Sequence, residues 1–216
     1  MLRLILVREN CTLSVDLEGK LGGSRSHIAL LQACIDGIDL LPPLQFVFDI
    51  HRVPRILRAG GPCTLRELLE NPRLTKIFPC CRGGADALYS ELSIAIEGVF
   101  DSGVVVDYML LRRPLNKPRK HDVVLHHWLG EESSPLQHIS SMVFVEKMFE
   151  ARPLPLRLFT YAIEDVIYCN KLGSCLLSAL QEDNSLEMGF SLQPLTPHRS
   201  HSATFFAAAL VSRLLS

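Results

Sequence analysis

The sequence lacks the features that mark several large classes of protein. None of its apolar runs reaches the roughly 18 residues that a membrane-spanning helix needs, so we expect no membrane segment. No C-x-x-C pair occurs among the seven cysteines, and the adjacent Cys80 and Cys81 have poor geometry for a disulfide. An odd number of cysteines without pairing motifs predicts a reduced, intracellular protein, and nothing in the sequence chooses between nucleus and cytoplasm.

The chain also has little net charge and no internal repeat. A net charge of −1 gives no overall attraction to nucleic acid or to an acidic partner, so only local charge can indicate a ligand. The length of 216 residues and the hydrophobic fraction of 48% suit one globular domain. We expect this domain to cover residues 1–180, followed by a tail at 181–216 that begins polar and rich in Pro, Ser and His.

The order of predicted elements indicates an α/β fold. The first part reads as a β-meander, and strands and helices then alternate, which predicts a mixed sheet with helices on its faces. The strands are expected at 2–7, 12–17, 28–35, 46–50, 76–78 and 99–101. The helices are expected after the cap Thr64 and before Pro72, after Gly83-Gly84 as far as residue 92, and at 104–111, 123–129, 142–149 and 156–180.

The strand at 12–17 runs into an acidic pair, Asp16 and Glu18. On a strand the side chains of i and i+2 point to the same face, so these two carboxylates are expected to project together. Side-by-side carboxylates repel each other, and a hard divalent ion between them would relieve the repulsion. An exposed edge strand with two solvated acids would show the same pattern.

Three residues further along the chain could join this pair. Asp86 is expected at the start of a helix after the Gly-Gly turn, where an acid also suits the helix dipole. Tyr161 and Asp165 are four residues apart on the predicted helix at 156–180 and therefore share a face. A buried aspartate there needs a partner or a metal ion, although Tyr161 alone could equally be a core tyrosine.

Together, these segments resemble the RNase D-like, DEDDy-type 3′–5′ exonucleases, and most closely the Exd-like 3′–5′ exonuclease domain-containing proteins. The resemblance covers roughly residues 12–172. Val15-Asp16-Leu17-Glu18-Gly19 resembles the first motif and Lys76-Ile77-Phe78 with Cys81-Arg82 and Asp86-Ala87-Leu88-Tyr89 the second. Arg152-Pro153-Leu154-Pro155 followed by Tyr161-Ala162 and Asp165-Val166 resembles the third.

The resemblance implies an RNase H-like mixed β-sheet flanked by helices and hydrolysis of phosphodiester bonds at the 3′ end of nucleic acid. It also implies that Asp16, Glu18, Asp86 and Asp165 hold two divalent ions, Mg²⁺ or Mn²⁺, and that Tyr161 orients the attacking water. Single-stranded 3′ ends would be the substrate, with RNA and DNA both open.

The sequence departs from the family around its second motif. Pro79-Cys80 replaces a common His-Asp pair, Gly84 stands where a further acid is common, and Ser102-Gly103 replaces the usual Thr-Gln. Some members of the group are thought to bind RNA without cutting it. A nucleic-acid-binding adaptor with weak catalysis is therefore the alternative function.

The only dense basic stretch is a proline-broken loop at 112–121, which contains five Lys or Arg residues. An acidic pocket repels phosphate, so a basic rim would have to supply affinity for the substrate. The predicted rim consists of Lys20 and Arg25 near the first strand and of Arg112, Arg113, Lys117, Arg119 and Lys120 in the loop. A solvated connection would have the same composition.

Overall fold

The computed structural model describes residues 11–21, 26–36, 42–58, 64–111, 129 and 147–182. The predicted strand at 2–7, the basic loop, almost all of the helix at 123–129, most of the helix at 142–149 and the tail from 183 lie outside these residues. Within them, no helix is long and apolar enough to cross a membrane. No disulfide joins the six cysteines of the described part.

A five-stranded mixed sheet forms the centre of the fold, with strand order β3-β2-β1-β4-β5. The β-meander is confirmed: β1 (Thr12–Lys20), β2 (His27–Asp36) and β3 (Leu44–Asp49) pair antiparallel. The strands β4 (Thr75–Phe78) and β5 (Val99–Asp101) run parallel to β1. The α/β prediction with a mixed sheet is therefore correct.

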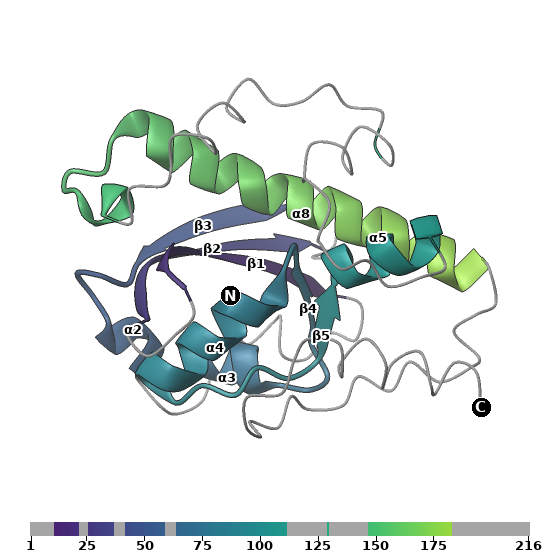
Figure 1. Cartoon of the computed structure of the whole chain (residues 1–216), viewed down its shortest axis with the longest axis horizontal. Coiled ribbons are helices and arrows are strands. Elements are labelled where there is room, and N and C mark those ends of the chain that lie inside the picture. The colour runs from purple at the N-terminus through teal and green to yellow at the C-terminus, as the bar shows by residue number, and fades with distance from the viewer. Residues whose placement is uncertain are drawn as a thin grey trace.

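Helices cover both faces of this sheet (Figure 1). The long helix α8 (Leu156–Glu182) and the short α5 (Ser102–Leu111) lie on one face. The other face packs against α2 (Arg55–Arg58), α3 (Leu65–Glu70) and α4 (Cys81–Leu92). A 3₁₀ turn, η1 (Met148–Glu150), precedes α8, so the described end of the helix predicted at 142–149 is not an α-helix.

The start of α4 differs from the prediction. The helix begins at Cys81, so Gly83 and Gly84 lie inside its first turn rather than before it. The cause is a distant cap: a carboxylate oxygen of Asp101, at the end of β5, accepts a hydrogen bond from the Cys81 amide at 2.9 Å. A local sequence pattern cannot show a cap that lies 20 residues away. Asp86 therefore lies within α4 rather than at its start.

A buried chain of polar groups sets the position of α8 along the sheet. The Ser14 hydroxyl on β1 donates to the Asn170 amide oxygen at 2.9 Å. The Asn170 amide nitrogen donates in turn to Asp36 at the end of β2, at 3.1 Å. Ser14 and Asn170 are both buried, and sliding α8 by one residue would leave their polar groups without partners. This chain therefore fixes which residues of α8 lie over β1.

A glycine lets α8 approach the sheet closely. A Cβ atom at Gly173 would clash with the side chain of Ile77 on β4. It would contact Cγ2 and would lie 2.8 Å from Cδ1. Ile77 is fully buried in the cluster between α8 and α5, so its side chain has no free space to enter. The separation between helix and sheet thus depends on the missing side chain.

Replacement of this glycine by alanine should destabilise the protein. Gly→Ala inside a helix normally stabilises by about 0.5–1 kcal/mol, but overpacking of a core costs about 1–3 kcal/mol. We expect Gly173→Ala to lower the free energy of unfolding in urea. Gly83→Ala is the matched control, because a Cβ there meets only Leu21 Cβ at 3.6 Å, and it should raise stability. An equal rise in both variants would contradict the packing argument.

Candidate active site

The acidic pair of β1 lies on the face of the sheet that α8 covers. Leu13, Val15 and Leu17 point into the core against α4 on the other face. Asp16 and Glu18 alternate with them and point towards α8, as Ser14 does. One Asp16 oxygen accepts from the Leu17 amide at 2.8 Å, which orients the carboxylate. The sequence prediction that these acids project together agrees with this arrangement.

The helix α8 supplies the third acid. Ligand oxygens of Asp16, Glu18 and Asp165 all lie within 4.8 Å of one another, and each residue is partly buried. The Tyr161 side chain forms a hydrogen bond with Asp165, one helical turn away. The buried residues Ala162 and Val166 hold this face of α8 against the sheet. Residues separated by about 150 positions in the sequence thus meet at one site.

Burial and repulsion raise the pKa of every acid in this group. Loss of water raises the pKa of Asp16 to about 7, with a further contribution from the Asp165 charge. Burial, followed by the charges of Asp16 and Asp165, raises the pKa of Glu18 to about 9. Burial also raises the pKa of Asp165 to about 6, although the bond from Tyr161 opposes this shift. The phenol pKa of Tyr161 is raised by burial and by the neighbouring carboxylates.

The three carboxylates fit a divalent cation. Their oxygens are the ligands that Mg²⁺ and Mn²⁺ prefer, and they are close enough to share one ion. A bound cation would favour the charged form of each acid. It would therefore lower the pKa values that burial and repulsion raise.

Most of the chain matches a known sequence family. A family described as 3′-5′ exonuclease matches residues 10–181. The chain belongs to the 3′–5′ exonuclease family. The strand that carries Asp16 and Glu18 and the helix that carries Asp165 both lie within the matched residues. A search of the curated proteins finds no match.

Solved structures show the same exonuclease fold. An RNase D from Trypanosoma brucei in complex with RNA U12 has a TM-score of 0.68 at 19% identity, covering 96% of this chain and 75% of its own. Brucella melitensis NrnC with bound Mg²⁺ has a TM-score of 0.59 at 20% identity, covering 94% and 81%. Escherichia coli RNase D has a TM-score of 0.61 at 16% identity, covering 86% and 43%. The expected RNase D-like, mixed-sheet fold is confirmed.

Asp86 is not part of the three-acid group. Its side chain is exposed on α4, and the described group of possible metal ligands near β1 contains only Asp16, Glu18 and Asp165. Gly84, where the resemblance implies a further acid, is buried, and a Cβ there would lie 2.8 Å from Leu17 Cδ1. The role of Asp86 as a metal ligand therefore stays a prediction.

The predicted basic rim is largely outside the described residues. Of its members, only Lys20 is described, and it is exposed at the end of β1, two residues beyond Glu18. Arg25 and the basic residues of 112–121 are not among the described residues. Their contact with substrate stays a prediction.

Two residues of the site were missed by the sequence analysis. Gln32 pairs directly with Asp16 across β1 and β2, and its buried amide has no hydrogen-bond partner among the described residues. A polar residue inside the apolar run at 28–35 was the available signal. Phe149 of η1 lies against Tyr161, with ring centroids 6.2 Å apart. No sequence signal connects these two rings.

The site predicts how stability changes with pH. The folded pKa values of Asp16 and Glu18 lie above the ordinary values of 3.8 and 4.5. Protonation therefore stabilises the metal-free fold below about pH 4, and this contribution is lost as pH rises through about 7 and 9. In EDTA, the melting temperature should fall between about pH 5 and 8, and saturating Mg²⁺ should restore it at pH 8.

Glu18→Gln is the control for this pH dependence. The amide cannot ionise, so the variant should show a smaller fall in melting temperature with rising pH and a smaller gain from Mg²⁺. Identical curves for the variant and the wild type would mean that Glu18 is not a raised-pKa carboxylate.

Proposed function

We propose that this protein is a metal-dependent 3′–5′ exonuclease of the DEDDy type, which hydrolyses the terminal phosphodiester bond of single-stranded nucleic acid. The observation that supports this function best is the convergence of Asp16, Glu18 and Asp165 beside Tyr161. The family match and the RNA complex of the similar RNase D support nucleic acid as the substrate.

The three carboxylates would hold the metal, and Tyr161 would act on the attacking water. Mg²⁺ or Mn²⁺ held there would lower the pKa of a water molecule and withdraw charge from the phosphate. The phenol of Tyr161 stays protonated at neutral pH, because burial and nearby carboxylates raise its pKa. It can therefore donate or accept a hydrogen bond at the water without competing as a base. The Mg²⁺ seen in the similar NrnC supports the choice of ion.

Whether the site holds one ion or two depends on a fourth acid, Asp86. The two-metal scheme needs carboxylates on both sides of the reacting phosphate. Asp16, Glu18 and Asp165 are enough to hold one ion, and a second one would require a further donor such as Asp86. We keep the two-ion count as part of the proposal, to be tested through Asp86.

A second candidate function is a nucleic-acid-binding module with weak hydrolysis. The exposed position of Asp86, outside the three-acid group, favours it. Such a protein would keep the fold and one metal site and would bind strands without releasing nucleotides at an appreciable rate.

Hydrolysis by acid variants separates these functions. On a 5′-labelled single strand with Mg²⁺ or Mn²⁺, the wild type should produce a ladder that shortens from the 3′ end. Asp16→Asn should lower the rate by about 10²–10³-fold, because the stabilising charge at the reacting phosphate is lost. Asp86→Asn should lower it similarly if two ions act. Glu70→Gln, on the opposite face of the sheet, is the charge-matched control and should keep wild-type activity.

The results have distinct meanings. Wild-type activity in Asp86→Asn would exclude Asp86 as a ligand and leave a three-acid enzyme. Unchanged activity in Asp16→Asn would contradict the exonuclease mechanism. A wild type that binds strands and Mg²⁺ but releases no nucleotides would favour the binding module.

Binding of single strands should depend on salt through the basic loop. Each neutralised phosphate releases counterions, so reversing Lys117, Arg119 and Lys120 should reduce the slope of log affinity against log salt by about 2. The loss should be similar for all sequences, because phosphate contacts do not read bases. Reversal of Arg52, Arg55 and Arg73, which are exposed residues of the described part, is the control for net charge. An unchanged slope in the loop variant would make the loop a solvated connection.

A further inference from the structure

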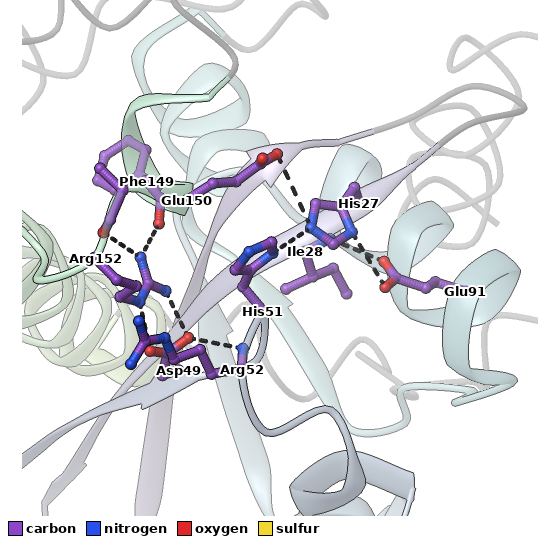
Figure 2. Close-up of polar contacts among 10 residues, drawn as sticks. His27, Ile28, Asp49, His51, Arg52, Glu91, Phe149, Glu150 and Arg152 are labelled. Carbon is purple, nitrogen blue, oxygen red and sulfur yellow. Dashed lines mark hydrogen bonds and ion pairs between the residues drawn. The ribbon is translucent and has the colours of Figure 1, made fainter.

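A second group of metal-binding side chains lies away from the three acids. His27 at the start of β2, His51 just after β3 and Glu150 in η1 place ligand atoms within 4.8 Å of one another. Figure 2 shows the two imidazoles side by side, with Glu150 approaching His27 from the η1 segment. The three residues come from parts of the chain separated by as many as 123 positions, so no sequence motif reveals the group.

The distances suit a zinc-class ion. His27 Nε2 lies 3.0 Å from His51 Nδ1 and 3.9 Å from Glu150 Oε1. Two ligands of a tetrahedral Zn²⁺ with bonds of about 2.0–2.1 Å lie about 3.3 Å apart. Shifts of about 0.3 Å and 0.6 Å would therefore bring the His27–His51 and His27–Glu150 pairs to this spacing, and the remaining pair already lies within 4.8 Å. Such shifts are available, because His51 is exposed and the other two side chains are half-buried.

A fourth residue orients His27 for this role. Glu91, near the end of α4, lies 3.6 Å from His27 Nδ1. Its other oxygen accepts from the Ile28 amide at 2.8 Å, which fixes the carboxylate. A carboxylate facing Nδ1 favours the proton on that nitrogen and leaves the Nε2 lone pair directed at His51 and Glu150. Histidine ligands of metals usually have such a carboxylate on the second ring nitrogen.

We infer that His27 Nε2, His51 Nδ1 and the Glu150 carboxylate form a binding site for Zn²⁺, with Glu91 as the positioning residue. Two neutral imidazoles and one carboxylate are a ligand set that Zn²⁺ prefers over Mg²⁺. A water molecule completes the coordination. The site is distinct from the three-acid group, which contains oxygen ligands only.

The bound ion would attach η1 to the sheet. Arg152 already links this segment to β3, because its guanidinium donates two bonds to Asp49 and further bonds to the carbonyls of Phe149 and Ala151 (Figure 2). The zinc site adds Glu150 to the same attachment. Phe149 packs against Tyr161, so the attachment also supports the wall beside the tyrosine.

Cobalt spectroscopy and zinc titration test this site on the whole chain. After removal of metals with EDTA and of the chelator by dialysis, one equivalent of Co²⁺ should give the strong visible bands of a four-coordinate ion with imidazole ligands. One equivalent of Zn²⁺ should abolish the bands and raise the melting temperature. His51→Ala should lose the bands and the thermal shift, and this variant should fold because His51 is exposed.

Three further variants make the test specific. Glu91→Gln should weaken zinc affinity by about 10–100-fold while keeping the cobalt bands, as expected of a positioning residue. Asp165→Asn should keep both signals, because its carboxylate belongs to the other group. Arg52→Ala alters the same turn without removing a ligand and should behave as the wild type.

Two outcomes would overturn the inference. Wild type without the cobalt bands would mean that the histidines and acids form only a hydrogen-bonded cluster. Equal bands and equal zinc affinity in the wild type and His51→Ala would place the ion elsewhere on the chain. Six more histidines occur outside the described residues, and the His51→Ala variant separates their binding from that of this site.

Discussion

The position of α8 relative to β1 is the constraint on which the candidate active site depends. The helix is held lengthwise by the bonds from Ser14 to Asn170 and from Asn170 to Asp36. Its distance from the sheet is set at Gly173, where any side chain would clash with the side chain of Ile77. Asp165 lies on the same rigid helix, between these fixed points and Tyr161. The register of the bonds at Asn170 therefore determines where the Asp165 carboxylate lies.

The close placement of the three carboxylates lowers the stability of the fold. Three carboxylates are placed at one point on a half-buried surface, and both burial and repulsion raise their pKa values. A water-exposed arrangement would avoid this cost, but it would also hold an ion less tightly. The packing of α8 is what keeps the acids together in the absence of a cation.

Local sequence patterns predicted those parts of the site that lie on one element. The i, i+2 spacing placed Asp16 and Glu18 on one face of a strand, and the i, i+4 spacing joined Tyr161 to Asp165. The resemblance to RNase D-like exonucleases brought these elements together, which spacing alone could not do. The alternation of strands and helices likewise predicted the mixed sheet.

The remaining features depend on contacts between distant segments. The start of α4 was placed too late because Asp101 caps it from β5. Gln32 lies at the site because its strand pairs with the strand of Asp16. The residues next to Gln32 in the sequence do not show this. His27, His51 and Glu150 lie in three separate segments, and none of them belongs to a motif in its own segment. The i, i+2 and i, i+4 spacings carry no information about contacts between distant segments.

The late position of α8 in the chain has a consequence for synthesis on the ribosome. The strands β1, β2 and β3 emerge before this helix, and they present the apolar residues Ala29 and Leu30, which α8 later covers with Leu158 and Ala162. Until the helix leaves the exit tunnel, this face of the sheet is open to water and to other nascent chains, a state that favours aggregation. A chaperone that binds apolar strands would have its longest opportunity during this interval.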